Sequence, residues 1–421
     1  MRQRLKKSPA TIRYVFVAAY VIILAAVILA ASALGGVKEI KDITVVGCTV
    51  SETFTDHLGI ALAGTAPSGT VITAETGTET VSASVRGNSF ILRLRISELD
   101  KITVHLKAVR DDGSAVCETE WKGTPGTWVP NDSWAVVTGE DSQLFLKKAL
   151  MDPQGVTVMD DDYMEALEER IRSRIDTIHK DLPDTEFIYL LVPTTATMYP
   201  DRIPSEYMLT DGMTAYDQMK ALLERAGATV IDPRDELREH KNDDMPIYYM
   251  TDSHWTQYGA YFAYEKLFSY ISGKYPAAAP RGLDEFSWEP GQYRAGDLAY
   301  YLNLPQKDLP ELCYTRKLPQ GVPEEISDIR VFTDDESRFY ESFGVLAKEI
   351  IDTGREDLPS ALIYRDSYSV ALYDIVAERF SRTYMRGCFD YGWKPNEILE
   401  EKPDYVIFIY CEYNFDAITD S

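Results

Sequence analysis

Alternating strand-like and helix-like segments, from about residue 133 to the C-terminus, constrain the fold of this chain more than any other feature. Apolar runs of strand length are expected at residues 185–193, 229–233, 360–365 and 404–413. Helices are expected between them, at residues 160–182, 215–228, 256–268 and 367–380. Because strands that alternate with helices build a parallel sheet covered on both faces, residues 131–421 are predicted to form an α/β domain.

Residues 37–130 have a different pattern. Four short segments rich in β-branched residues, such as FILRLRI and KITVHLKAV, are separated by turn signals such as Gly-Asn-Ser and Asp-Asp-Gly. This spacing predicts a small β-sandwich. The Pro- and Gly-rich stretch at residues 123–134 then marks a boundary near residue 130.

The first 36 residues contain a membrane signal. A basic tail precedes residues 14–34, which contain no charged residue. That length crosses about 30 Å of hydrocarbon, and the preceding Lys and Arg residues keep the N-terminus in the cytoplasm. We therefore expect a single-pass cell-membrane protein with its main part outside the cell. Ala31-Ser32-Ala33 also fits a signal-peptidase site, but the apolar run is longer than in a cleavable signal, which favours an uncleaved anchor.

Charge and cysteine content narrow the possible partners. The formal net charge of −24 disfavours a nucleic-acid partner, and its ordinary consequence is solubility. Outside the cytoplasm, Cys48 would pair with Cys117 and Cys388 with Cys411, or the thiols would stay unpaired and buried. There is no Cys-x-x-Cys motif, and no cofactor is predicted.

A serine follows the predicted strand at residues 360–365. Ligands gather at the carboxyl ends of strands in open parallel sheets, and Ser367 lies at such an end, before a helix. There its hydroxyl would be exposed and its own N–H would belong to the positive end of that helix. Ser and Asp are also the usual N-cap residues, so Ser367 alone would be read as a cap.

The stretch YYMTDSHWTQYG supplies the groups that a nucleophilic serine needs. His254 is one of five histidines in the chain, and Asp252 precedes it by two residues. Imidazole is the usual base for a serine, and a carboxylate fixes its tautomer. The alternatives are a surface or capping histidine and a pair of metal ligands, although no other metal motif completes such a site.

The same stretch resembles the Asp-x-His-Trp signature of the SGNH-hydrolase-like alginate O-acetyltransferase group, AlgJ- and AlgX-like, and most of all its Gram-positive DHHW branch. Four other stretches match this group in the expected order, over about residues 139–415: GEDSQLFLKKAL, LLVPTTATMYPDRIP, AGDLAYYLNLP and IYRDSYSVAL. The resemblance implies an SGNH-hydrolase-like parallel sheet flanked by helices, after a transmembrane helix and a small β-sandwich.

The resemblance also implies the roles of the site residues. Ser367 would take an acyl group, His254 would carry the proton and Asp252 would hold His254. The partners would be a polysaccharide acceptor and a membrane-bound O-acyltransferase that supplies acetyl groups. The alternatives are an acetylesterase with the same triad and a non-catalytic glycan-binding or assembly scaffold.

Other residues near the motifs are weaker candidates. Arg365, Trp255 and Tyr368 are expected to contact substrate, although Trp255 also suits a core position. The sequence departs from the group at Thr194 and Thr195, where a Lys is common. It also departs at Arg365 and Asp366, which replace a Gly-Thr or Gly-Asp pair. The backbone N–H of Ser367 is the first candidate for an oxyanion hole, while Asn303 and Asn414 are equally suited to turns.

Overall fold

The computed structural model describes seven stretches of the chain: residues 39–54, 56–97, 101–124, 136–322, 328–332, 348–386 and 392–420. The expected transmembrane segment at residues 14–34 and the expected boundary near residue 130 lie outside these stretches. Within them, no helix is both long and apolar enough to span a bilayer.

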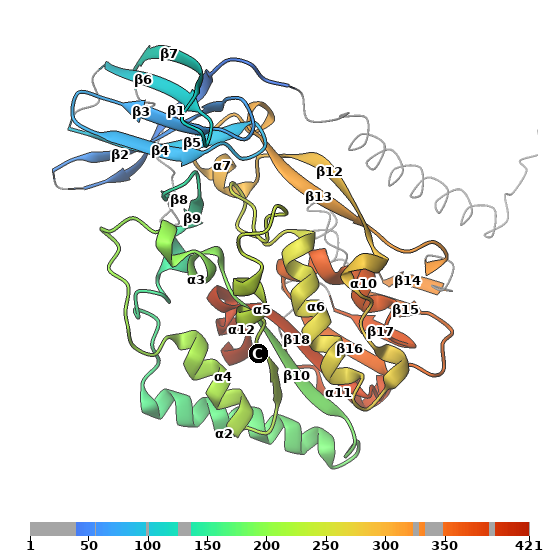
Figure 1. Ribbon diagram of the computed structural model, residues 1–421. Helices are drawn as coiled ribbons and strands as arrows, with labels where there is room; N and C mark the ends of the chain where they lie inside the picture. Colours follow the sequence, from blue (N-terminus) through green and yellow to red (C-terminus); the bar gives the residue numbers. More distant parts are fainter. Residues whose placement is uncertain are drawn as a thin grey trace, which may run out of the picture.

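Seven strands build the N-terminal region (Figure 1). One antiparallel sheet contains β1 (Thr44–Thr53), β2 (Leu58–Thr65) and β5 (Ser89–Ile96). The other, in the order β4-β3-β6-β7, contains β3 (Val71–Glu75), β4 (Thr80–Ser84), β6 (Ile102–Val109) and β7 (Ala115–Gly123). Alternate apolar side chains of both sheets share one core, which includes Ile60, Leu92, Ile72 and Leu106. We call this region the sandwich.

The α/β region contains a seven-stranded mixed sheet in the order β11-β10-β18-β16-β17-β15-β14. Its parallel part consists of β10 (Glu186–Val192), β11 (Thr229–Ile231), β16 (Ser360–Arg365), β17 (Arg382–Met385) and β18 (Tyr405–Cys411). The edge strands β14 (Asp328–Phe332) and β15 (Lys348–Asp352) pair antiparallel. The prediction of a parallel sheet is therefore wrong at this edge, where β15 runs antiparallel to both of its neighbours, β14 and β17.

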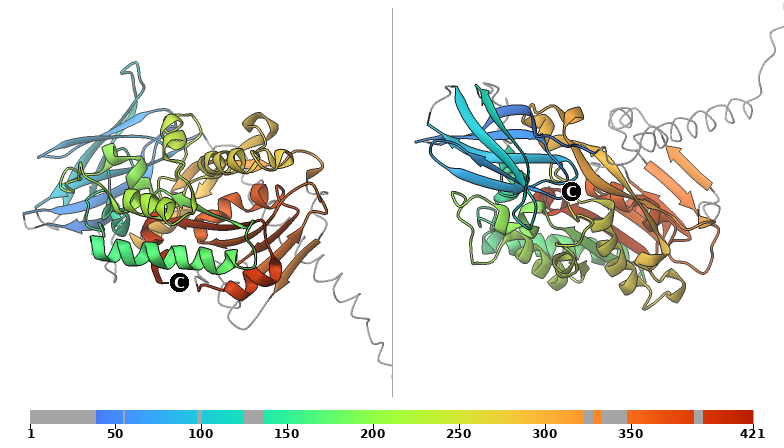
Figure 2. Two further views of the ribbon diagram at one scale, coloured as in Figure 1. Left: turned by 90° about the horizontal axis from the view of Figure 1, so that it is seen from below. Right: turned by 45° about the horizontal axis from the view of Figure 1, so that its top comes forward.

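Helices cover both faces of this sheet (Figure 2). On one face, α6 (Gln257–Ile271) and α10 (Tyr373–Ala377) pack on strand residues such as Ile188, Ile363 and Ile407. On the other, α2 (Asp161–His179) and α4 (Ala215–Arg225) pack on alternate residues such as Tyr189 and Leu362. Strands buried on both faces are apolar at every position, which is why the sequence shows continuous apolar runs.

Side-chain caps begin these helices. Asp160 accepts a hydrogen bond from the backbone N–H of Tyr163 at the start of α2. Thr214 and Asp217 form a capping box at the start of α4. The hydroxyl of Thr256 accepts from the N–H of Gly259 and starts α6 immediately after His254. Each cap satisfies an N–H that has no partner within the helix.

The remaining smaller elements are distributed around the sheet. They are β8 (Val136–Thr138), β9 (Leu144–Leu146), α3 (Thr195–Met198), α5 (Arg234–Glu239), α7 (Asp297–Tyr301), α11 (Pro395–Glu401), α12 (Asp416–Asp420) and the antiparallel pair β12 (Ser287–Arg294) and β13 (Pro310–Lys317). Two 3₁₀ helices bear on the site, η1 (Lys147–Leu150) and η6 (Ser367–Leu372).

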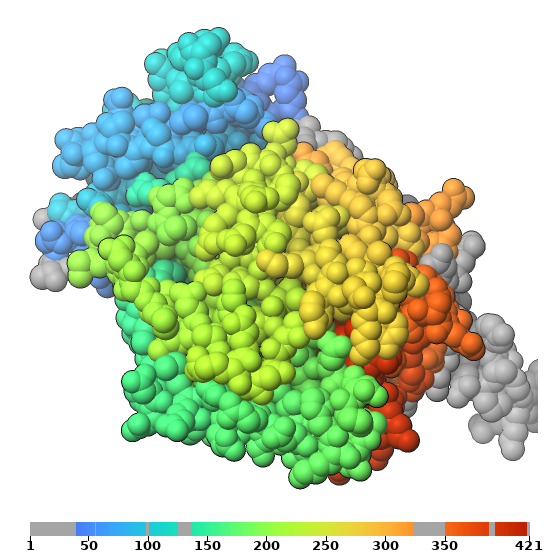
Figure 3. Space-filling model, turned by 60° about the horizontal axis from the view of Figure 1, so that its bottom comes forward, coloured from blue at the N-terminus to red at the C-terminus, as the bar shows by residue number. Residues whose placement is uncertain are grey.

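The sandwich is joined to the α/β region by specific polar contacts. Asp141 accepts from the backbone N–H of Ser84 at 2.8 Å and pairs with Arg86 at 3.0 Å. The hydroxyl of Ser142 accepts from the N–H of Ile91 at 3.1 Å. The space-filling view shows the sandwich in direct contact with the rest of the molecule (Figure 3). These bonds place the segment after β8 between the two regions.

The cysteine alternatives are resolved for the described residues. Cys117, Cys313 and Cys411 carry free thiols. Cys117 therefore forms no disulfide with Cys48, and the buried Cys411 forms none with Cys388.

Candidate active site

Ser367 lies at the carboxyl end of β16, where the strand turns into η6. Asp366 is fully buried and caps this turn. One carboxylate oxygen accepts from the N–H of Tyr368, and the other accepts from the N–H of Cys411 at 2.7 Å and from the side-chain amide of Asn414 at 3.0 Å. Asp366 thus ties the serine turn to the end of the neighbouring strand β18. Burial raises its pKa despite these three donors.

His254 and Asp252 lie on the irregular segment that leads into α6. The ring nitrogen Nδ1 of His254 is 2.7 Å from Oδ1 of Asp252, and the backbone N–H of His254 donates to the same oxygen at 3.0 Å. This two-residue loop is the closed arrangement that the Asp-x-His spacing predicted.

The second ring nitrogen of His254 reaches the serine. Nε2 lies 2.8 Å from the hydroxyl oxygen of Ser367, which is 113 residues further along the chain. With Nδ1–H donating to Asp252, Nε2 is free to accept the serine proton. The structure therefore brings together all three residues predicted from the sequence, in the order hydroxyl, imidazole, carboxylate.

The charges of His254 and Asp252 stabilise each other. Burial alone would raise the pKa of Asp252, but the hydrogen bond and charge of His254 outweigh it and lower that pKa. Burial alone would lower the pKa of His254, but Asp252 raises it, and the charges of Asp297 and Asp366 raise it further. The pair therefore stabilises the imidazolium that forms when Nε2 takes a proton.

Two residues outside the predicted set hold Asp252. Its Oδ2 accepts from the phenol of Tyr293 on β12 at 3.0 Å and from the N–H of Asp297 at 3.4 Å. Gly296 lies directly against it, since a Cβ at this position would meet Oδ2 at 2.2 Å. A side chain at residue 296 would therefore displace the carboxylate.

Asp297 is a second carboxylate beside the histidine. It accepts from both the N–H and the hydroxyl of Ser253, at 2.8 and 2.7 Å, and that hydroxyl lies 3.4 Å from Nδ1 of His254. Burial and the charge of Asp252 raise the pKa of Asp297. The only sequence signal for it was its place in the Gly-Asp-Leu stretch of AGDLAYYLNLP.

Hydrogen bonds to two side chains from other segments hold the residues that precede Asp252. Glu311 on β13 is buried and accepts from the N–H of Met250 and from the N–H and hydroxyl of Thr251. Burial raises its pKa to about 7. The side-chain amide of Gln143 donates to the carbonyl of Tyr249 at 2.9 Å. The only sequence signal for Gln143 was its place in the matched stretch GEDSQLFLKKAL, and nothing in the sequence pattern indicated Glu311.

Trp255 and Tyr368, predicted to contact substrate, link the two halves of the site. Both are 1% exposed. The indole N–H of Trp255 donates to the carbonyl of Tyr368 at 2.8 Å, and the phenol of Tyr368 donates to the carbonyl of Ser253. Their polar ends bond to the opposite chain segment and their rings lie in the core, so both residues connect the two halves, and their contact with substrate stays a prediction.

Arg365 is also buried, at 4% exposure, and donates to the hydroxyl of Ser369 at 3.3 Å. As the last residue of β16, its side chain points to the face of the sheet shared by Ile363 rather than to solvent. The prediction that Arg365 meets substrate is therefore not supported by its position.

Metal binding would compete with the observed bonds. Asp252, His254 and Asp297 each offer one ligand atom, and these atoms lie within 4.8 Å of one another. However, Nδ1 of His254 is directed to Asp252 and Nε2 to Ser367. His254 is therefore arranged for proton transfer between Ser367 and Asp252.

A small cavity lies beside the site. This cavity measures about 10 Å³, which is the size of a single water. Ser253, Tyr368 and Thr195 are among the residues that line it. Asn414 is bonded to Asp366, and Asn303 adopts a left-handed turn conformation with φ of 55°. The backbone N–H of Ser367 stays the candidate donor to an oxyanion.

Comparison with known proteins agrees with this fold. Residues 136–334 match the family of the SGNH hydrolase-like domain of acetyltransferase AlgX. The predicted resemblance to the AlgJ- and AlgX-like group is confirmed over these residues, which include Asp252 and His254 and end before Ser367. No curated protein matches the chain significantly.

Solved structures extend the comparison. PatB1 from Bacillus cereus superposes with a TM-score of 0.50 at 16% identity, over 67% of this chain and 98% of PatB1. A DHHW family protein from Eubacterium siraeum gives 0.44 at 16% identity, over 75% and 95%. The O-acetyltransferase domain of Pseudomonas putida AlgJ gives 0.39 at 19% identity, over 66% and 91%. The likeness to PatB1 shows a shared fold over 67% of this chain.

Proposed function

We propose that this chain, whose residues 136–334 form an AlgX-like SGNH hydrolase domain, is a serine O-acetyltransferase that acetylates a polysaccharide. The acetyltransferase family of the matched domain supports the type of reaction. The observation that carries the proposal is the hydrogen-bonded path from the hydroxyl of Ser367 through His254 to Asp252, with lengths of 2.8 and 2.7 Å.

In the first half of the reaction, Ser367 attacks the carbonyl carbon of an acetyl ester. Nε2 of His254 takes the proton of the hydroxyl as the new bond forms, and Asp252 stabilises the resulting imidazolium. The N–H of Ser367 is the candidate donor to the oxyanion. The intermediate then expels the donor's alcohol oxygen, which takes the proton back from His254 and leaves acetyl-Ser367.

The second half reverses these steps with a sugar. A sugar hydroxyl gives its proton to Nε2 of His254 and attacks the acetyl carbonyl. Collapse releases the acetylated sugar and returns the proton to the oxygen of Ser367. If water took the place of the sugar, the same triad would act as an esterase, so the acceptor that reaches the site decides the outcome.

The location and the donor are also part of the proposal. Residues 14–34 would anchor the chain, with the N-terminus in the cytoplasm and the triad outside. A membrane-bound O-acyltransferase would then supply acetyl groups from inside. Protease added to intact cells should digest the α/β region, whereas protection of that region would contradict this orientation.

Turnover of p-nitrophenyl acetate by the full chain tests the triad. Ser367→Ala and His254→Ala should each lower kcat on the order of 10³-fold or more. Mass spectrometry after brief reaction should find the acetyl group on the peptide that contains Ser367. Unchanged turnover in either variant would overturn the proposal.

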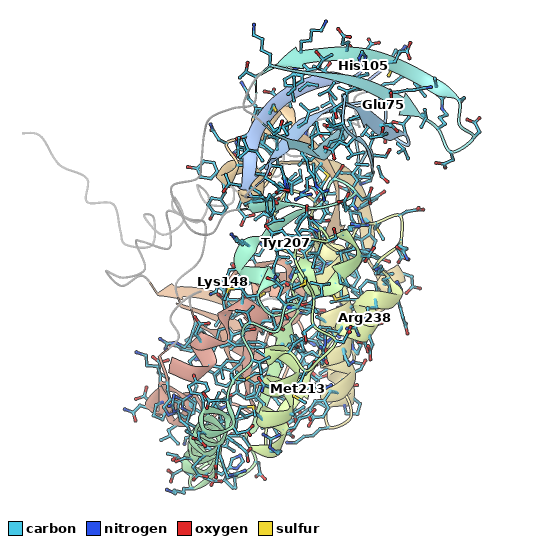
Figure 4. All side chains as sticks on the ribbon, turned by 90° about the vertical axis from the view of Figure 1, so that its left-hand side faces the viewer. Glu75, His105, Lys148, Tyr207, Met213 and Arg238 are labelled. Carbon is cyan, nitrogen blue, oxygen red and sulfur yellow. The ribbon has the colours of Figure 1, made fainter. Side chains whose placement is uncertain are left out.

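Matched controls are available on the surface. Ser205 is exposed, and His105 lies on the outer sheet of the sandwich, far from the α/β sheet (Figure 4). Ser205→Ala and His105→Ala should keep full turnover. In cells that lack the chain, loss of acetyl esters from surface glycans supports transfer, and their accumulation identifies an esterase.

A further inference from the structure

We propose that Tyr300 and Tyr301 form an aromatic platform that binds a sugar ring of an uncharged polysaccharide acceptor beside Ser367. The inference rests on the proposed acetyltransferase function and names the surface and the type of glycan. Both tyrosines end helix α7, and their side chains are large apolar groups on the surface, 65% and 39% exposed. In the part of the chain that the structure describes, neither phenol forms a hydrogen bond.

The geometry of α7 directs both rings to the side of the triad. Residues three and four apart share one side of a helix, so Tyr300 and Tyr301 lie on the same side as Asp297. Asp297 bonds to Ser253, the residue next to His254. The opposite side of the helix packs against the sandwich through Leu298, Ala299 and Leu302.

Electrostatic coupling agrees with this placement. Burial raises the pKa of the Tyr301 phenol, and the charges of Asp297 and Asp252 raise it further. The phenol therefore lies within range of two carboxylates of the site. At about 1.5 Å of rise per residue, Tyr301 stands about 6 Å along the helix axis from Asp297, a distance comparable to one sugar ring.

The small cavity that adjoins the triad cannot hold an acceptor sugar. The cavity next to Ser253 and Tyr368 measures about 10 Å³, which is too small for a sugar ring. The hydroxyl of Ser367 and the ring of His254 are partly exposed. We therefore place the polymer on the outer surface, on the side of the site where Asp297 of α7 bonds to Ser253.

The two rings suit a sugar better than an entirely apolar ligand. Their centroids are 5.9 Å apart with an angle of 63° between the planes, so they present a ring face and a ring edge side by side. A tyrosine combines an apolar ring, which packs on the C–H face of a sugar, with a hydroxyl that bonds to sugar oxygens.

Charge selects the class of glycan. Asp252, Asp297 and Asp366 surround His254, and the whole chain carries a formal net charge of −24. Lys148 lies over the ring of Tyr413, with its ammonium 3.9 Å from the carboxylate of Asp416. A polyuronate would be repelled by this field, whereas an uncharged glycan would not.

Acetyl transfer by the full chain from p-nitrophenyl acetate to sugar oligomers tests the platform. N-acetylglucosamine and glucose oligomers are the uncharged probes, and oligogalacturonate is the charged probe. Each transfer rate is divided by the same variant's turnover of p-nitrophenyl acetate without acceptor, so damage to folding or to the triad cancels. Tyr300→Ala and Tyr301→Ala should each raise the acceptor KM about tenfold, with a smaller change in kcat for transfer.

Two variants separate stacking from general damage. Tyr300→Trp keeps a ring and should keep the KM within about threefold, since indole also stacks on sugars. Tyr163→Ala removes a tyrosine of similar exposure from α2 and should leave both KM and turnover unchanged. An unchanged acceptor KM in Tyr300→Ala and Tyr301→Ala would overturn the platform, and faster transfer to oligogalacturonate would overturn the choice of glycan. Failure of the proposed function looks different, because the unaltered chain would then show no turnover that depends on Ser367.

Discussion

The two halves of the candidate site are held in place by different means. Ser367 follows a central strand, and Asp366 fixes its turn by accepting N–H groups from the end of β18 and from η6. His254 lies on irregular backbone, where side chains from β12, α7 and β13 bond to the residues around it. The main chain of the sheet therefore positions the nucleophile, whereas distant side chains position the base. Changes to the first half should cost stability and activity together, and changes to the second should cost mostly activity.

Asp252→Asn should cause the largest loss of kcat, because it disrupts the half of the site that holds the base His254. An amide at this position can donate to Nδ1 and so select the wrong tautomer of His254, which leaves Nε2 protonated and unable to accept from Ser367. We expect kcat for p-nitrophenyl acetate to fall on the order of 10⁴-fold. The surface pair His240 and Asp243, with a similar distance of 2.8 Å, provides the control Asp243→Asn. A loss below about tenfold would show that Asp252 does not set the tautomer.

Asp366→Ala should break the nucleophile half. It leaves the buried N–H groups of Cys411 and Tyr368 without acceptors, at a cost of about 1–3 kcal/mol in unfolding free energy for each. Displacement of Ser367 should also lower kcat by about 10²-fold. Urea unfolding and turnover measure the two effects. An unchanged free energy of unfolding in this variant would contradict the view that the Asp366 carboxylate fixes the serine turn by binding backbone N–H groups.

The same contrast explains what the sequence revealed. Ser367 was recognised because a strand followed by a serine and a helix is a local pattern, and the sheet places that pattern at its carboxyl edge. The Asp-x-His pair was also local, since two residues suffice to close the carboxylate onto the ring. Both predictions depend only on short-range geometry and on the parallel strands.

The remaining contacts join residues far apart in the sequence. Tyr293 and Glu311 are 41 and 60 residues from their partners Asp252 and Thr251. Their own segments show only a short antiparallel pair of strands, so no periodicity distinguishes them from surface residues.

Trp255 was ambiguous because an aromatic residue beside a catalytic motif suits a sugar contact and a core equally well, and its hydrogen bond to Tyr368 supports the core position. The antiparallel edge of the sheet was missed because β14 and β15 are five-residue segments that contain charged residues, so they lack the continuous apolar run of the central strands.

Trp255→Phe should loosen the connection between the two halves. It keeps a ring in the core but removes the N–H that bonds to the carbonyl of Tyr368. A hydrogen bond of this type contributes about 0.5–1.5 kcal/mol, so we expect a loss of about two- to tenfold in kcat. Tyr368→Phe removes the reciprocal bond to Ser253, and the double variant should lose less than the product of the two single losses. Fully multiplicative losses would show that the two bonds act independently.

Asp297→Asn should have the smallest effect on kcat at the optimum and a specific effect on pH dependence. His254 must be neutral to accept the serine proton, so turnover should fall as the pH drops through its pKa, which Asp252, Asp297 and Asp366 hold above the usual 6.5. Removing the charge of Asp297 lowers that pKa, so the acidic limb of the profile should move to lower pH. Asp243→Asn should leave the profile in place.

A shift to higher pH would mean that Asp297 acts on the imidazole in some way other than through its charge, and an unshifted limb would mean that Asp297 is protonated in the active form. Because only a charge beside His254 moves this limb, the measurement separates an electrostatic contribution to the base half from the purely structural support that Ser253 receives from the same carboxylate.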